Sequence, residues 1–236
     1  MNLILLFEDD FVKDRRRVSL RGRRHEHVLN VHRASAGDRL SVGLLNGMIG
    51  TGAVTRIDDD ALEMDIALDR DPPPPLDVTL ILALPRPIVL KRILLSASSM
   101  GVKRIVLIHS RRVEKSYWNS PVLDEKKIKE QLILGLEQAR DTVMPEVWLR
   151  QKFKPFVEDD LPDMIKGTLP LVAHPGTSEP CPSQVNRPVT LAIGPEGGFM
   201  PYEVEMLEAA GFRSVNIGER ILRVETAVPV LLSKLF

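Results

Sequence analysis

Strand-like and helix-like hydrophobic patterns alternate along the last two thirds of the chain. Short apolar runs, each typical of a buried strand, occupy residues 78–84, 104–108, 146–149, 169–173, 189–193 and 214–217. Stretches typical of helices lie at 87–100, 124–139, 155–166, 201–210 and 226–236. This alternation predicts an α/β fold with a parallel sheet covered by helices on both faces. Because such sheets bind ligands beyond the carboxyl ends of their strands, we look for a site in the loops that follow the apolar runs.

The first third of the chain has a different pattern. Residues 38–45, 49–57 and 61–68 are typical of short β-strands, and Asn46-Gly47 is a tight-turn signal between the first two. The pattern predicts a small antiparallel β-barrel. Four consecutive prolines at 72–75 donate no backbone hydrogen bonds and favour an extended path. We therefore expect two domains, residues 1–72 and 73–236.

Composition excludes several classes of protein. The 236 residues include 32 basic and 32 acidic side chains, so the net charge gives no argument for a polyanionic partner. The one cysteine, Cys181, allows neither an intrachain disulfide nor a thiolate zinc site. The N-terminal apolar stretch is too short for a signal peptide, and the longest apolar runs are too short for a membrane span. We expect a cytoplasmic protein with no membrane role and no metal.

Positive charge is concentrated near the N-terminus. Residues 13–33 contain eight Lys or Arg side chains against two acidic ones. Arginine at this density beside a small barrel favours contact with RNA phosphates, although a solvated charged face is the common alternative. The candidates are Lys13, Arg15, Arg16, Arg17, Arg21, Arg23, Arg24, His25 and Arg33. Arg111 and Arg112, which follow the run 104–108, are further candidates, with a solvated pair as their alternative.

One glycine-rich loop follows an apolar run and precedes a helix, in L-A-I-G-P-E-G-G-F-M-P at 191–201. A phosphate-binding loop needs Lys and Ser or Thr after its glycines, whereas Phe199, Met200 and Pro201 follow here. Glu196 would also repel an anion. The simple alternative is a turn whose glycines only supply positive φ angles.

A second segment, V-N-I-G-E-R-I-L-R-V-E-T-A-V-P at 215–229, repeats the arrangement. Gly218 ends an apolar run, Thr226 is a suitable N-cap for the following helix, and Pro229 is then tolerable in its first turn. Two such loops at one sheet edge would form a cleft that recognises a ligand by backbone groups.

Together, G-P-E-G-G-F (194–199) and I-G-E-R-I-L-R-V-E-T-A (217–227) closely resemble the paired signature of the ribosomal small subunit methyltransferase E family. These SPOUT-class enzymes methylate uridine N3 in small-subunit ribosomal RNA. Similar segments occur at 82–85, 100–107, 137–140 and 23–33, so the resemblance covers nearly the whole chain. It implies a C-terminal SPOUT α/β domain with a trefoil knot, a PUA-like N-terminal barrel that binds RNA, and a homodimer.

The resemblance also implies that S-adenosylmethionine binds in the knotted loops, with the end of the run 169–173 as a third wall. This cofactor has no phosphate, so the missing Lys and Ser are consistent with it, and glycines permit close backbone approach to it. For Leu222, ordinary core packing is an equal alternative. The expected cofactor residues are Ala173, His174, Pro175, Gly194, Pro195, Glu196, Gly197, Gly198, Ile217, Gly218, Leu222, Arg223, Thr226 and Ala227.

Methylation of uridine N3 requires a positioned nucleophile and the loss of its proton. Negative charge then develops across O2, N3 and O4, and a fixed cation would stabilise it. Arg223 is the expected cation, with Glu225 or Glu196 as base or organiser. Two alternatives stay open: an Arg223–Glu225 ion pair that shapes the loop, and a Glu196 that only steadies its own loop.

The expected activity is S-adenosylmethionine-dependent methylation of uridine N3 in 16S rRNA of the small ribosomal subunit, on a target that is unpaired or flipped out. One alternative is a non-catalytic RNA-binding or ribosome-assembly factor, which the intact cofactor motifs disfavour. Another is a SPOUT methyltransferase that acts on a different RNA atom, such as a ribose 2′-hydroxyl.

Overall fold

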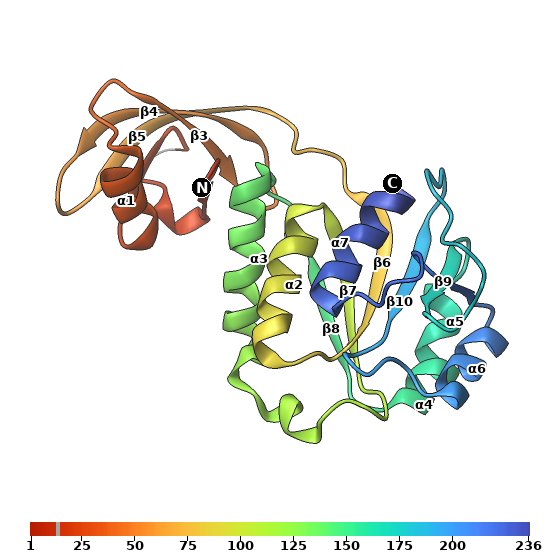
Figure 1. Cartoon of the computed structure of the whole chain (residues 1–236). Helices are drawn as coiled ribbons and strands as arrows, with labels where there is room; N and C mark the ends of the chain where they lie inside the picture. The colour runs from red at the N-terminus through yellow and green to blue at the C-terminus, as the bar shows by residue number, and fades with distance from the viewer. Residues whose placement is uncertain (13–14) are drawn as a thin grey trace. The chain divides into compact units, whose positions relative to one another are not determined.

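The computed structural model describes residues 1–12 and 15–236, which form two units (Figure 1). The N-terminal unit contains Met1–Pro74 together with Ile133–Met144, and the C-terminal unit contains Pro75–Leu132 and Pro145–Phe236. The sequence-based division places residues 133–144 in the second domain, whereas in the structure they pack with residues 1–74.

The N-terminal unit is built on a five-stranded sheet in the order β1-β3-β4-β5-β2. Its strands are β1 (Ile4–Leu6), β2 (Arg17–Leu20), β3 (Arg39–Leu44), β4 (Ile49–Ile57) and β5 (Leu62–Arg70). The last three are the strands expected from the sequence. The expectation of a purely antiparallel sheet is wrong, because β1 pairs with β3 in parallel while the other pairs are antiparallel. Short helical segments η1 (Glu8–Asp10), α1 (Arg23–His27) and η2 (Val28–His32) lie between β1 and β3.

Side-chain alternation explains how this sheet is buried. In β5, Leu62, Met64 and Ile66 face the main core of the unit. In β1, Ile4 and Leu6 join the same core, while Leu5, with Leu3 just before the strand, faces a second cluster that contains Leu136. Residues 133–144 thus cover the second side of β1, which is why this strand is buried on both faces.

The C-terminal unit contains a six-stranded, fully parallel sheet in the order β11-β9-β10-β6-β7-β8. Its strands are β6 (Leu76–Ala83), β7 (Val102–Ile108), β8 (Glu146–Arg150), β9 (Leu169–Ala173), β10 (Val189–Ile193) and β11 (Arg213–Val215). Every residue of the central strand β10 is buried, as expected for a sheet covered on both faces. The predicted α/β architecture is confirmed.

Helices follow the strands as the sequence indicates: α2 (Pro87–Ser99), α3 (Glu125–Ala139), α6 (Pro201–Ala209) and α7 (Val224–Leu235). The helix expected at 155–166 is a series of short pieces, α4 (Phe153–Pro155), η5 (Phe156–Asp160) and α5 (Leu161–Met164), and η3 (Lys115–Asn119) and η4 (Pro121–Leu123) precede α3. Helices α2 and α7 pack against each other, and α4, α5 and α6 gather on the other side of the sheet (Figure 1). Across residues 1–12 and 15–236, we find no helix with the length and apolar character needed to cross a bilayer.

The start of α7 differs from the sequence prediction. Arg223, not Thr226, is the N-cap residue, and Pro229 lies inside the helix beyond its first turn. Val224, the first helical residue, is buried, so tertiary packing starts the helix earlier than the capping preference of Thr226 would. Both predictions, the N-cap at Thr226 and the proline in the first turn, are therefore wrong.

Candidate functional site

A cavity of about 340 Å³ opens at the carboxyl edge of the parallel sheet, within the C-terminal unit. Its walls are the loops that follow β9, β10 and β11, three neighbouring strands, with the start of α7. This volume is in the range of small-molecule sites. The lining residues include all the expected cofactor residues except Arg223 and Thr226. They also include Arg112, Gly176, Ile193, Phe199, Asn216, Arg220, Ile221, Val224 and Leu231.

The first glycine loop has no room for side chains at its turn. A Cβ atom on Gly194 would lie 2.9 Å from the backbone N of Phe199 and 3.1 Å from the Cα of Gly198. Gly198 has a φ of 72° and donates its N–H to Pro195 O at 2.7 Å. These glycines therefore bring bare backbone to the cavity wall, as the sequence indicated.

Asn216 joins two of the cavity walls, and the sequence reasoning missed it. Its amide nitrogen donates to Thr177 O in the loop after β9. Its Oδ1 accepts the N–H of Gly218 at 3.1 Å, the hydrogen bond of an Asx-turn. The sequence signal for this turn is an Asn two residues before a glycine at a strand end.

The loop after β9 forms the third wall expected from the resemblance. The N–H of His174 donates to Val215 O at 2.9 Å, which ties this loop to the end of β11. A Cβ on Gly176 would lie 2.7 Å from His174 Nε2, so this glycine keeps space for the imidazole.

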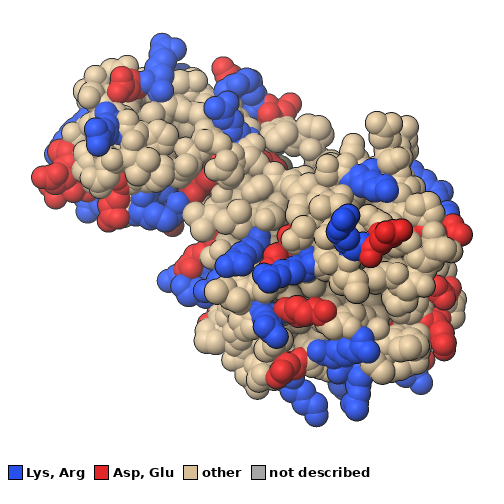
Figure 2. All heavy atoms as spheres, in the orientation of Figure 1, with Lys and Arg blue, Asp and Glu red and all other residues tan. Residues whose placement is uncertain are grey.

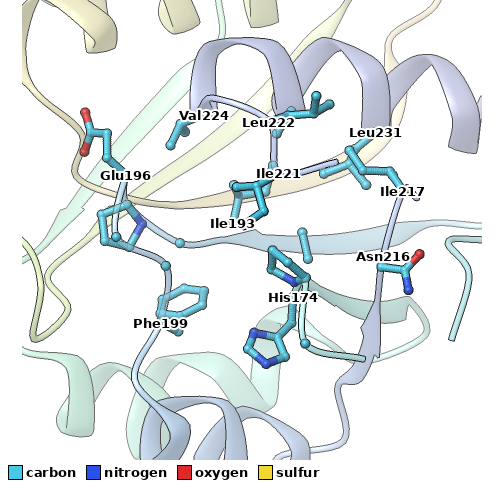
Figure 3. Close-up of a pocket in the computed structure, with 18 of the residues that line it drawn as sticks. His174, Ile193, Glu196, Phe199, Asn216, Ile217, Ile221, Leu222, Val224 and Leu231 are labelled. Atoms are coloured by element: carbon cyan, nitrogen blue, oxygen red, sulfur yellow. The ribbon is translucent and has the colours of Figure 1, made fainter. Parts of the chain in front are cut away.

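Apolar side chains gather on one side of the cavity (Figure 3). Ile193, Ile217, Ile221 and Leu231 lie on the side of α7, whereas His174 and Phe199 lie across from them in the view. Ile221 is 82% exposed, an unusual state for isoleucine. A flat apolar ring bound here would cover this side chain and remove its surface from water.

The three expected catalytic residues are not brought together. Arg223 and Glu225 do not line the cavity, and no ion pair between them occurs among the described residues. Glu196 does line it, but its Oε1 accepts the N–H of Arg86 at 3.0 Å. Figure 3 shows its carboxylate directed away from the apolar cluster. This geometry agrees with the alternative in which Glu196 steadies the glycine loop.

The loop after β7 reaches the same cavity through Arg112. Its guanidinium Nη1 donates to Gly197 O, and Arg112 is part of the lining. The buried carboxylate of Glu203, in the first turn of α6, fixes the adjacent backbone. Its Oε1 accepts the N–H of Arg111 at 2.7 Å, and its Oε2 accepts the N–H of Met200 at 2.8 Å.

His109 and Trp118 complete the loop after β7. The indole N–H of Trp118 donates to His109 Nδ1 at 2.9 Å, so this aromatic residue has a structural contact within its own loop. Burial lowers the pKa of His109, and Lys115 acts in the same direction while Glu203 opposes it. The lowered pKa favours the neutral form of His109.

The arginines near the N-terminus have varied surroundings. Arg24 forms a bidentate pair with Asp10, and Arg23 forms one with Glu137. His25 is buried, with its Nε2 2.7 Å from Asp58 O. Arg15 pairs with Glu8 and Arg17 with Asp65 on the surface, and Arg16, Arg21 and Arg33 are also exposed. Lys13 lies outside the described residues.

Basic and acidic side chains are intermixed on the visible face of the N-terminal unit (Figure 2). No group of three or more His, Cys, Asp or Glu in the described ranges is placed to hold a metal ion.

Known proteins match most of this chain. The RNA methyltransferase domain family matches residues 72–236. The ribosomal RNA small subunit methyltransferase E of Treponema pallidum is 30% identical over 96% of this chain and 87% of its own length. The ribosomal RNA small subunit methyltransferase E 1 of Borreliella burgdorferi is 24% identical over 96% and 94%. The chain therefore belongs to the ribosomal RNA small subunit methyltransferase E family.

A solved structure has the same fold. The ribosomal RNA small subunit methyltransferase E of Neisseria gonorrhoeae, bound to S-adenosylmethionine, matches with a TM-score of 0.76. The sequence identity is 21%, and the match covers 99% of this chain and 95% of that one.

Proposed function

We propose that the protein uses S-adenosylmethionine to methylate N3 of a uridine in 16S rRNA of the small ribosomal subunit. The observation that carries this proposal is the cavity, because its three walls meet at one sheet edge and offer backbone groups beside apolar side chains. Family membership supports the reaction class, and the cofactor named for the Neisseria structure supports the methyl donor.

The residues fit this cofactor. Gly194 and Gly198 leave the backbone bare for close approach, and the side chains of Ile217, Leu222 and Ala227 provide apolar contact for an adenine ring. Adenosine and methionine groups carry no phosphate, which agrees with a loop that lacks the Lys and Ser of phosphate sites. When bound, the cofactor supplies an activated methyl group on a sulfonium.

The protein then has to hold the uracil ring in line with that methyl group and stabilise the charge that develops as N3 loses its proton. Arg223 and Glu225 remain candidates from the sequence, but neither lines the cavity. The cations that line it are Arg112 and Arg220. Glu196 is proposed to steady the glycine loop, since its carboxylate accepts the N–H of Arg86.

We propose RNA contact by the exposed arginines of the N-terminal unit, Arg15, Arg16, Arg17, Arg21 and Arg33, and by Arg111 and Arg112. Arg24 and His25 are left out because they are engaged inside the unit, and Arg23 is left out because its guanidinium holds Glu137. A PUA-like barrel is the proposed class of this unit, supported by its strongly paired five-stranded sheet.

A trefoil knot, a homodimer and a cytoplasmic location are further parts of the proposal. The order of the strands supports a knot, because β10 enters between β6 and β9 after both have been laid down in the chain. The exposed apolar side chains Ile221, Val230 and Phe236 support a dimer contact, which sedimentation would test. A ribosomal RNA substrate supports the proposed cytoplasmic location.

The test is incubation with labelled S-adenosylmethionine and small ribosomal subunits that lack the modification, followed by nucleoside analysis. Label in 3-methyluridine is the expected result. Label on a ribose hydroxyl would favour a SPOUT enzyme for another atom. RNA binding without transfer would overturn the enzyme reading and favour an assembly factor.

A further inference from the structure

Arg112 and Arg220 bring positive charge to the cavity, and they differ in how firmly they are held. The Arg112 guanidinium donates to Gly197 O, and its Cδ would lie 3.0 Å from a Cβ on Gly197. The side chain therefore lies directly along the glycine loop. Arg220 lies in an exposed loop and has no hydrogen bond or ion pair among the described residues.

Glu203 fixes the backbone that carries Arg112. Its side chain is fully buried, and its two oxygens accept N–H groups from different loops, Arg111 after β7 and Met200 before α6. The Met200 bond caps α6, so the carboxylate sits in the favourable field of a helix N-terminus. The Arg111 bond has no role in the helix; it holds the loop after β7 against the glycine loop.

We propose that Arg112 is the catalytic residue whose guanidinium faces the uracil ring during methyl transfer, and that Glu203 is a positioning residue that holds Arg112 in place. The proposal rests on the proposed function and names the cation of that same site. Arg112 lines the cavity in the described chain, whereas Arg223, the cation expected from the sequence, does not.

In this step the N3 proton passes to solvent water, and the N3 lone pair forms the new bond to the methyl carbon. The electron pair of the sulfur–methyl bond returns to sulfur. A guanidinium stays protonated throughout and offers parallel N–H donors, so it can stabilise the negative charge on O4 or O2 as N3 ionises. The charged residues around Arg112 are Glu196 and Arg220 in the cavity wall, Glu203 on α6, and Arg111 in the loop after β7.

The first test compares Arg112→Gln with Arg213→Gln, a change of an exposed arginine outside the cavity lining, on small subunits reconstituted from transcripts that contain uridine or 5-fluorouridine. We expect Arg112→Gln to lower the maximal transfer rate about 100-fold, the effect of removing one charge-stabilising donor. Arg213→Gln should stay within about 3-fold of wild type, as for a residue outside the reacting site. Arg112→Lys, which keeps the charge but not the planar fork, should recover part of the rate.

Three further readouts separate catalysis from loop structure. Loss of the cation should move the acid limb of the rate profile to higher pH, because N3 then ionises less readily. 5-Fluorouridine, whose N3 is more acidic, should restore Arg112→Gln more than it accelerates wild type. Calorimetric affinity for S-adenosylmethionine should change little. An unmoved acid limb, no preferential rescue, or a loss confined to cofactor affinity would each overturn the proposal.

The second test is a double-mutant cycle with Glu203→Gln. If Glu203 acts through Arg112, the Glu203→Gln change should slow wild type clearly but have little further effect in Arg112→Gln, a non-additivity that a general structural role would not produce. Additive losses would refute the positioning role. If Glu203→Gln does not fold, Glu203→Asp, which keeps the charge but shortens the reach, is read in the same way. Absence of transfer by wild type would instead defeat the proposed function itself.

Discussion

Replacing Arg24 by Met should destabilise the protein without changing how it binds RNA. The Arg24 guanidinium donates two hydrogen bonds to Asp10, at 2.6 and 2.7 Å, and a third to Leu5 O at 2.6 Å. It also lies 4.6 Å from the centre of the Phe7 ring. The two side chains of the ion pair are only 14% and 10% exposed, so Arg24→Met leaves the Asp10 carboxylate largely buried with its partner lost.

Removing one partner of a buried pair costs about 3 to 5 kcal/mol, and the residual exposure here favours the lower end, about 3 kcal/mol. In a chain of this size a loss of that magnitude lowers the melting temperature by about 6 to 12 °C. The matched control is Arg21→Met, because Arg21 is exposed in the same segment. That change should leave the stability within about 0.5 kcal/mol of wild type.

RNA affinity measured over a series of salt concentrations provides the second half of the test. If Arg21 contacts a phosphate, Arg21→Met should reduce the slope of log affinity against log salt by somewhat under one unit, about 0.7 to 0.9. Arg24→Met should leave that slope unchanged, measured at a temperature where the variant is folded. A smaller slope with normal stability for Arg24→Met would refute the structural role of Arg24.

Three other changes test the cavity and its surroundings. Gly194→Ala should lower the calorimetric affinity for S-adenosylmethionine at least about tenfold, because its Cβ would collide with the backbone N of Phe199; unchanged affinity would contradict the close approach. Glu196→Gln should retain most of the transfer activity, since an amide oxygen can still accept the N–H of Arg86; a complete loss would identify Glu196 as the base. The lowered pKa of His109 means that the unfolded state binds more protons, so stability is lost as pH falls below the ordinary value of 6.5. Urea titrations at pH 7.5 and 5.5 should show a smaller loss of unfolding free energy in His109→Gln than in wild type. An equal loss in both would refute this role of His109.

The sheet of the C-terminal unit was predictable because its central strands are buried on both faces. Runs such as Val189–Ile193 are apolar apart from Thr190 and are separated by stretches with a helical pattern, which is the signature of parallel strands. In the N-terminal unit, Ile4–Leu6 was not expected, since three apolar residues carry no alternation that marks a strand. Its parallel pairing with Arg39–Leu44 depends on tertiary contacts that no local pattern records.

The glycines of the site were predictable because glycine is the residue that fits where a turn leaves no room for a side chain or needs a positive φ. Gly194 follows β10 where a Cβ would lie 2.9 Å from the backbone N of Phe199, and Gly218, after β11, has a φ of 119°. Arg112 was singled out only as a possible RNA contact, because its position against Gly197 joins segments 85 residues apart in the chain. In the sequence, Glu203 is an ordinary acidic residue in the first turn of a helix. Its second hydrogen bond, from the N–H of Arg111, depends on the tertiary structure and has no sequence signal.

The packing of residues 133–144 within the N-terminal unit affects how the chain folds during synthesis. Leu136 is fully buried in the cluster with Leu3 and Leu5, and the backbone N–H groups of Asn2 and Leu3 donate to Glu137 O. The first 74 residues therefore cannot complete their core when they emerge, and must wait until residues 75–144 have been translated. Because domains usually fold in order from the N-terminus, we expect an early intermediate with an exposed apolar strand, and a fragment cut at the prolines should remain incompletely folded.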